Sequence, residues 1–393
     1  MKRFGLHPTV WATASTHFVV DAYGNMFAPL LPLLIPQLNL SLATVGLLAM
    51  CFQLASSVSQ LGFGTLADRW RPRVLLIGGP LLSVVVLSAL GSATTVPALA
   101  ALLLIGGLGG AAFHPPAAAL VHAVSGDRKG LAMSAHISGG SLGFALAPLV
   151  FAPSVVLLGH QWAWFVAVPG LVALSYTLRL IQRVEIPRKH AKEGWRHLRP
   201  YAKPLALLYM IVVLRTLTAN SLSVFLPVLL TRQGMGVNEA SAAVSAYLVV
   251  STVGGFLGGP LADRYGARQV IIWSLVSAVP FLLVGQLASG WGLTALVSIG
   301  GFLLQSTLPV NVTFGQQIAP VSAATVSSLM MGFAWGVGSL LAPVVGLLGD
   351  SLGLNVALSI TAVVPLFAAL FALPLPRRIP SHVPAGLSPL RPE

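Results

Sequence analysis

The chain is poor in charge, and poorest in acid. Charged residues make up 8% of its 393 residues, and Asp and Glu together number only 9. A soluble domain carries about 25% charged residues. Here 56% of the residues are hydrophobic and the mean hydropathy is +0.87. These values exclude a soluble globular protein.

Cysteine is almost absent as well, since Cys51 is the only one. A single thiol excludes an internal disulfide framework. The sequence also shows no nucleophile–base pairing and no cofactor-binding motif. We therefore expect neither an enzyme nor a bound cofactor.

Long apolar segments dominate the chain. A transmembrane helix needs roughly 20 apolar residues, and the segments of that length are 9–35, 43–66, 74–93, 96–122, 130–153, 160–180, 204–230, 238–261, 269–288, 291–317, 323–349 and 353–374. The 40 glycines and 28 prolines are compatible with this pattern, because transmembrane helices tolerate both. We predict an all-α membrane protein of twelve transmembrane helices.

A repeated motif divides these helices into two halves. The motif from Gly64 to Arg73, GTLADRWRPR, returns from Gly259 to Arg268 as GPLADRYGAR, and 259 − 64 gives an offset of 195 residues. The same offset relates Asn25 to Asn220, Pro32 to Pro227, Gly143 to Gly338, and Ala147-Pro148 to Ala342-Pro343. Such parallel repeats are typical of one class of membrane transporters. We predict six-helix bundles at 1–181 and 204–376, a cytoplasmic linker at 182–203 and a cytoplasmic tail at 377–393.

The net charge of +13 indicates topology, and we expect no nucleic-acid partner. With an even number of spans, Lys2, Arg3 and the basic residues of 179–203 fall on one side of the membrane, whereas Arg232 falls on the other. Basic loops favour the cytoplasm. We predict a multi-pass protein of a bacterial inner (plasma) membrane, with both termini cytoplasmic.

The doubled Gly-x-Leu-Ala-Asp-Arg-x-x-x-Arg motif resembles the loop signature of the major facilitator superfamily. Within that superfamily the chain resembles the fosmidomycin-resistance transporters, in the segments His17–Asp21, Phe52–Ser57, Phe113–Pro116 and Gly139–Pro148. The resemblance implies two bundles, in one monomer, that rock around a central cavity lined by helices 1, 4, 7 and 10. It also implies that a small-molecule drug leaves in exchange for protons, with the proton gradient as the energy source.

Two charged residues, Asp21 and Arg215, lie near the middle of expected spans, and together with His17 we assign them to proton coupling. An ionisable side chain at mid-bilayer costs about 2.5–3.5 kcal/mol and is functional by default. Asp21 and Arg215 lie near the middle of helices 1 and 7, and Asp21 corresponds to Thr216 in the repeat. We predict that Asp21 and Arg215 pair in at least one state. His17 and Asn25 lie four residues to either side of Asp21, on one helix face. The alternative is that the Asp21–Arg215 pair has a purely structural role and holds the two bundles together.

The substrate-binding candidates are polar or aromatic residues on the four cavity helices: Asn25, Phe113, His114, Arg215, Asn220, Gln305 and Asn311. A forked guanidinium suits an anionic substrate. His114 precedes Pro115 and Pro116, and its repeat mate is Pro309. Because proline removes a helical hydrogen bond, we expect helices 4 and 10 to be broken at one level; a simple kink is the alternative.

Two further groups have structural or gating roles. The expected gating residues belong to the repeated motif: Asp68, Arg69, Arg73, Asp263, Arg264 and Arg268. A purely topological role for these arginines is the alternative. Small residues and prolines of helices 5 and 11 are expected to form sliding surfaces between the bundles: Gly139, Gly143, Pro148, Gly338 and Pro343.

The sequence leads to one main interpretation and leaves others open. The main one is a proton-coupled antiporter that exports fosmidomycin-like or other small amphiphilic or anionic drugs. An importer, or a transition-metal carrier that uses His17, Asp21, His114 and His136, is the first alternative. Against metal, those residues come from three different helices, and the sequence places no acid beside His114 or His136. A non-transporting sensor or scaffold is the second alternative.

Overall fold

The computed structural model describes residues 6–69, 72–126, 128–181, 195–319, 326 and 328–377. Within these ranges the regular structure is entirely helical, and twelve helical segments are long and apolar enough to cross a membrane. Apolar helices satisfy their own backbone hydrogen bonds, which the bilayer core requires. The expected all-α architecture is confirmed.

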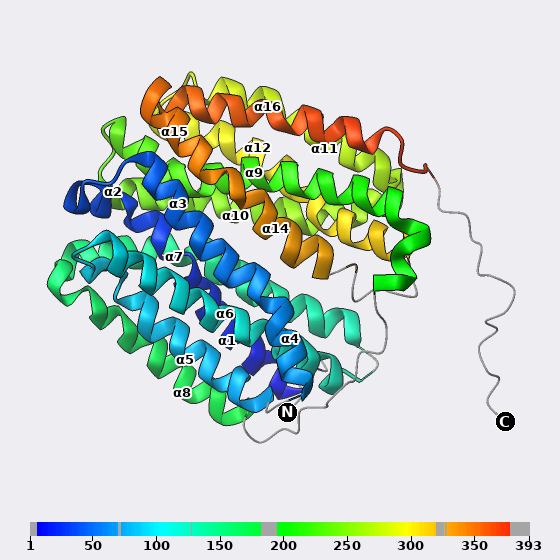
Figure 1. Ribbon diagram of the computed structural model, residues 1–393, viewed down its shortest axis with the longest axis horizontal. Coiled ribbons are helices and arrows are strands. Elements are labelled where there is room, and N and C mark those ends of the chain that lie inside the picture. Colours follow the sequence, from blue (N-terminus) through cyan, green and yellow to red (C-terminus); the bar gives the residue numbers. More distant parts are fainter. Residues whose placement is uncertain are drawn as a thin grey trace, which may run out of the picture.

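The first half contains six spans (Figure 1). In chain order its elements are α1 (Pro8–Gly24), α2 (Phe27–Leu38), α3 (Leu42–Gln53), η2 (Leu54–Val58), α4 (Ser59–Arg69), α5 (Pro72–Ser88), η3 (Leu90–Ser92), α6 (Val96–Val124), α7 (Lys129–Leu158), η4 (His160–Val166) and α8 (Ala167–Ile181). Side-chain caps begin α3 and α6, where Ser41 and Thr95 accept the backbone N–H groups of Thr44 and Ala98.

The second half repeats the arrangement. Its elements are η5 (Trp195–Tyr201), α9 (Ala202–Arg232), α10 (Val237–Tyr265), α11 (Ala267–Gly285), α12 (Gly290–Ile318), η7 (Ser328–Phe333), α14 (Ala334–Gly338), η8 (Ser339–Leu341), α15 (Ala342–Leu352) and α16 (Leu354–Ala372). Gly266, with φ of +89°, separates α10 from α11 inside the second copy of the loop motif. Of the expected linker, 182–194 lies outside the described residues.

Equivalent hydrogen bonds recur in both halves at the offset of 195 residues. Asn25 donates to the backbone O of Phe144, and Asn220 donates to Ser339, each spanning 119 residues. Two further pairs join neighbouring elements in the same way: Tyr23 to Val166 with Thr218 to Thr361, and His160 to Gly91 with Asn355 to Gln286. The repeat thus extends from the sequence to the bonds between helices.

The breaks in the helices do not lie where proline predicted them. α6 runs through Pro115 and Pro116, and α12 runs through Pro309, as continuous α-helix. The expectation that helices 4 and 10 are broken was therefore wrong, since neighbouring helices can accommodate groups that proline frees. The first span is interrupted instead at Asn25, and π-helix occurs at Leu54–Val58 and Ser328–Phe333. Such π-segments are frequent at functional sites.

Large apolar side chains cover the outer surface of the bundle. Leu157, Val172 and Leu287 are between 64% and 88% exposed, although they belong to or border membrane-spanning helices. Monomeric soluble proteins rarely expose continuous apolar surface on this scale. These side chains face the lipid.

The two halves make their closest crossing at the end of the molecule opposite η5, here called the distal end; the end at η5 is called the linker end. There α3 packs on α15. An ideal Cβ on Gly46 would lie 2.3 Å from the backbone O of Ala342, and one on Gly346 would lie 2.0 Å from that of Leu42. The α7–α10 and α2–α9 contacts also join the halves. In Figure 1, α4 and α14 diverge toward the linker end.

Candidate functional site

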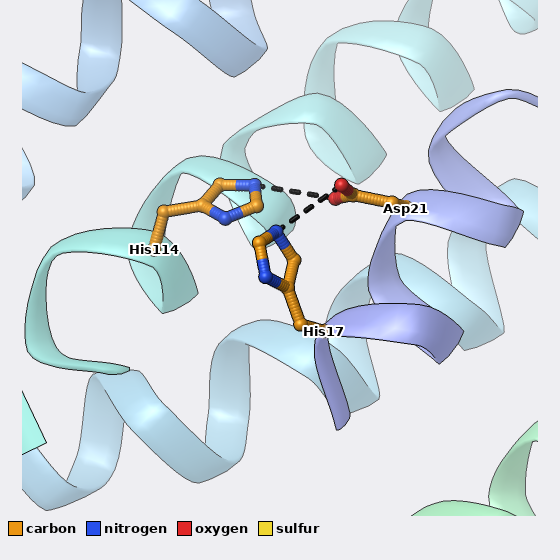
Figure 2. A group of neighbouring side chains, drawn as sticks. All are labelled: His17, Asp21 and His114. Atoms are coloured by element: carbon orange, nitrogen blue, oxygen red, sulfur yellow. Dashed lines mark ion pairs between the residues drawn. The ribbon is translucent and has the colours of Figure 1, made fainter. Parts of the chain in front are cut away.

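Three polar side chains converge inside the first half. His17 and Asp21 lie one turn apart on α1, and His114 reaches them from α6 (Figure 2). Nε2 of His17 lies 3.1 Å from Oδ2 of Asp21, and Nε2 of His114 lies 3.6 Å from Oδ1. The Asp21 and His114 side chains are 25% exposed, whereas His17 is 12% exposed. These three residues form two ion pairs, and we call them the His–Asp cluster.

The hydrogen bonds of His17 define where a proton must be. Its Nδ1 lies 2.9 Å from the backbone O of His136, and a carbonyl only accepts, so Nδ1 carries hydrogen. In neutral His17 the other nitrogen, Nε2, then has a lone pair facing the Asp21 carboxylate. Two acceptors repel at 3.1 Å. The contact is favourable only when one proton lies on Nε2 or on the carboxyl group.

Gly140 on α7 provides the space for this pair. A Cβ at Gly140 would lie 2.4 Å from Nε2 of His17 and 2.5 Å from Oδ2 of Asp21. Real Cβ atoms do not approach heavy atoms so closely, so any other residue would displace the pair. The sequence showed Gly140 only as part of a glycine-rich helix.

Aromatic rings enclose the cluster. His136 is buried, and its ring centroid lies 4.4 Å from that of His17. Phe113 is fully buried, with centroids 5.9 Å from His17 and 5.6 Å from His114. Phe113 therefore walls the cluster, whereas the sequence had proposed it for substrate binding. Nδ1 of His136 has no hydrogen-bond partner among the described atoms.

Arg215 lies in the other half and is not bonded to Asp21. It is 2% exposed; its Nη1 donates to Oε1 of Gln305 on α12, and its Nη2 lies 3.4 Å from Oγ1 of Thr216. The described contacts contain no carboxylate against this guanidinium and no partner for its Nε. The predicted pair is not made in this state, because the carboxylate is held by histidines and the guanidinium by an amide. Arg215 does not tie the bundles together here.

The remaining substrate candidates are distributed through both halves. Asn25 is buried and occupied by its bond to Phe144, and Asn220 is bonded to Ser339. These two asparagines join helices within their own bundle. Asn311 is fully buried, and neither side-chain polar atom has a described partner. The structure thus brings together His17, Asp21 and His114, and separately Arg215 and Gln305.

The motif residues proposed as gates have different surroundings. The side chains of Asp68 and Arg69 lie outside the described part of the structure. Arg264 lies over the ring of Tyr265 at 5.2 Å, and Asp263 is exposed. Arg268 donates to the backbone O atoms of Ala372 and Leu373, which lie at the end of α16. Arg73 makes a polar or electrostatic interaction as well.

The three glycines of the predicted sliding surface pack within their own bundle. Gly139 and Gly143 lie against the backbone O atoms of Ala14 and Phe18 on α1, and Gly338 lies against Thr216 on α9. These are contacts within one bundle, so that part of the prediction was wrong. Pro148 lies on the same α7 helix. Pro343 does reach the other half, where its Cα would lie 2.7 Å from a Cβ on Gly46.

Asp350, at the distal end, has a role that the sequence did not predict. It lies near the end of α15, and its two carboxylate oxygens each accept a backbone N–H at 2.9 Å, from Leu42 and Ala43 of α3. These are charge-assisted bonds to the positive end of a helix dipole. The partners are 308 and 307 residues away, and no local pattern indicates such a contact. Asp350 joins the two halves.

Comparison with known proteins identifies the family to which this chain belongs. The sequence profile of the Major Facilitator Superfamily matches residues 13–236 and 208–392. The chain belongs to the Major Facilitator Superfamily. It is therefore a multi-pass membrane transporter for a small-molecule substrate, and not an enzyme.

Individual relatives extend the comparison. The fosmidomycin resistance protein of Escherichia coli (strain K12) is 30% identical over 370 residues, covering 91% of this chain and 90% of its own. A chloramphenicol resistance protein of Streptomyces lividans is 28% identical, covering 92% and 94%. A crystal structure of a bacterial homologue of the human lysosomal transporter Spinster superposes with a TM-score of 0.81 at 17% identity, covering 93% and 95%. The chain thus shares more than nine-tenths of its length with each of these three proteins.

Proposed function

We propose that this transporter exports small anionic or amphiphilic drugs, of the fosmidomycin type, in exchange for protons. The observation that carries the proposal is the His17–Asp21 pair, whose geometry requires one proton between two acceptors. The resistance proteins of Escherichia coli and Streptomyces lividans support the drug class, because each aligns over about nine-tenths of this chain. We place the protein in a bacterial plasma membrane with both termini cytoplasmic.

The proton site gives a physical basis for coupling. Loss of the proton leaves a carboxylate facing the lone pair of His17, a repulsion that a change of helix packing must relieve. His114, 3.6 Å from Asp21, offers a second nitrogen that can receive the proton. Proton release and conformational change are then parts of one step.

The substrate site is assigned to the second half. Arg215 is a buried cation whose described partners are the neutral side chains of Gln305 and Thr216. A buried charge without an opposite charge is costly. A phosphonate or carboxylate would neutralise it, and the planar guanidinium would bind it through two parallel bonds. In another state of the cycle Asp21 takes that place and expels the anion.

Transport into everted membrane vesicles tests the proposal. We expect radiolabelled fosmidomycin to accumulate when the vesicle lumen is acidic relative to the outside, and accumulation to stop when the gradient is dissipated. Asp21→Asn removes the charge and should reduce uptake to the level of vesicles without the protein. Glu239→Gln is the matched control, because Glu239 is an exposed acid that bonds only Trp291 among its described contacts.

Two outcomes would contradict the proposal at different points. Uptake without dependence on the gradient would exclude proton coupling. Gradient-driven uptake that persists in Asp21→Asn would remove Asp21 from the mechanism while leaving export intact. Expression of each variant is verified by quantitative immunoblot of the same vesicles.

A further inference from the structure

The His–Asp cluster has a second chemical capacity. Its ligand set is two imidazole nitrogens and one carboxylate, which is a common set for zinc and for non-haem iron. The three ligand atoms all lie within 4.8 Å of one another. The sequence argued against metal because no acid could be placed beside His114; the structure overturns that objection by placing Asp21 Oδ1 3.6 Å away.

The spacing of these atoms is that of a coordination sphere. Ligands at 2.0–2.2 Å from a tetrahedral Zn²⁺ are about 3.3 Å from each other. Two distances lie on either side of that value: 3.1 Å from Nε2 of His17 to Oδ2 of Asp21, and 3.6 Å from Nε2 of His114 to Oδ1 of the same carboxylate. One ligand atom from each of the three residues lies within 4.8 Å of the other two. Side-chain rotations that bring both imidazole nitrogens and one oxygen of Asp21 to this spacing complete the geometry and leave a fourth position for water.

The surroundings of His17 also match those of a metal ligand. Metal-binding histidines almost always donate their second N–H to a carbonyl or carboxylate, which aims the lone pair of the first nitrogen at the metal. Nδ1 of His17 donates to the backbone O of His136, and Nε2 points to Asp21. With the side chains of Asp21 and His114 each 25% exposed, an ion can reach the cluster without unfolding it.

We propose that His17, Asp21 and His114 bind one divalent transition-metal ion, such as Zn²⁺, in competition with the coupling proton. When Zn²⁺ binds, the proton of the His17–Asp21 pair is released, so metal and proton cannot occupy the site together. The titratable groups around Asp21 are His17 on its own helix, His114 on α6 and His136 on α7. Acidification therefore weakens metal binding. A metal-loaded transporter would lack the proton step and stop cycling, a consequence that rests on the proposed function.

Metal binding to the purified full chain, without a histidine tag, tests the site independently of transport. Titration with Zn²⁺ is followed by calorimetry, and Co²⁺ is used as a spectroscopic probe of a low-symmetry N/O site. We expect one ion per chain. His114→Asn should weaken binding by at least about 100-fold, since removing even a supporting partner of a metal ligand costs about 10- to 100-fold. His122→Asn, an exposed histidine on the same helix, is the matched control.

Each outcome decides a separate question. Equal affinity in the His114→Asn and His122→Asn proteins, or more than one ion of the same affinity per chain, would overturn the site. Thermal unfolding of both variants verifies that they fold, and Asp21→Asn provides a second ligand variant. If the site binds Zn²⁺ but proteoliposomes accumulate ⁶⁵Zn, the ion is cargo and competition with coupling is overturned. If Zn²⁺ binds and fosmidomycin uptake is absent without metal, the proposed function fails while the metal site stands.

Discussion

Gly140 leaves the space in which the side chains of His17 and Asp21 meet. Alanine at this position would place a methyl group 2.4 Å from Nε2 of His17 and 2.5 Å from Oδ2 of Asp21. Both are side-chain ends that can swing aside, and alanine favours a helix over glycine by about 1 kcal/mol. We therefore expect Gly140→Ala to retain its thermal stability and lose gradient-driven uptake, measured on the same vesicle preparation.

A matched glycine separates this effect from general crowding. Gly110 on α6 lies in the same half, and a Cβ there would meet Val20 at 3.7 Å, an ordinary contact. Gly110→Ala should transport normally. If Gly140→Ala transports as well as Gly110→Ala, the packing of the proton pair is not needed for coupling.

Arg215 is the second residue whose role depends on what it is paired with. A structural tie would make Arg215→Met destabilising, because a partner would be left buried and charged. Its described partners, Gln305 and Thr216, are neutral, and a buried charge that no opposite charge compensates is itself costly, so its removal relieves that cost. We expect Arg215→Met to show no fall in the melting temperature and a complete loss of fosmidomycin uptake.

The opposite pattern would contradict this assignment. A melting temperature that falls in Arg215→Met, with uptake that persists in the surviving protein, would make Arg215 a structural residue. Arg215→Lys adds a graded test, since a compact ammonium keeps the charge but not the forked geometry. We expect it to raise the KM for an anionic drug more than it lowers the maximal rate.

At the scale of elements, α3 and α15 form a close joint between the two halves, and the proposed exchange mechanism requires this joint to open. The carboxylate of Asp350 caps α3 across this joint through two bonds of 2.9 Å, and hydrogen bonds to a charged group contribute about 1.5–3 kcal/mol each. Asp350→Asn removes the charge and one acceptor. We expect the distal end to open, which lengthens the distance between spin labels at Leu47 and Leu347 in a Cys51→Ser background.

The label positions and the control follow from exposure. Leu47 and Leu347 are 47% and 60% exposed on α3 and α15, so labels there do not disturb the close crossing at Gly46 and Gly346. Glu239→Gln, at the same end but with its described bond inside one half, should leave the distances unchanged. Identical distance distributions in Asp350→Asn and the unsubstituted protein would remove Asp350 from the gate.

The sequence predicted the helices better than it predicted the contacts between them. The twelve spans follow from apolar length, and the stacking of His17 with Asp21 follows from helical spacing. The approach of His114 to Asp21 depends on how α6 is rotated and shifted against α1, which no local pattern specifies. The same is true of the Asp350 cap. The prolines led to a wrong prediction of broken helices because proline removes one hydrogen bond, whereas α6 and α12 continue through it.

At the scale of the whole molecule, the distribution of basic residues predicts the orientation in the membrane. The linker region 179–203 and both chain ends are rich in Lys and Arg, and Arg232 is the exception on the opposite side. We expect green fluorescent protein fused after residue 377 to fluoresce, and alkaline phosphatase inserted after Gln233 to be active. The reverse pattern of reporter activities would invert the orientation and with it the direction of proton flow.

The recurrence of hydrogen bonds at a fixed offset shows which parts of the duplicated unit have stayed the same. The asparagine bonds at Asn25 and Asn220 persist in both copies, but His17 and Asp21 correspond to Val212 and Thr216. The bonds that join helices are therefore common to both copies, whereas His17 and Asp21 have no titratable counterparts in the second copy. In the proposed function the first copy carries the proton and the second presents the cation, Arg215. The second copy therefore offers the same scaffold for a second proton site. Its two equivalent positions, Val212 and Thr216, carry no titratable side chain, so substitutions there are the place to alter the ion stoichiometry.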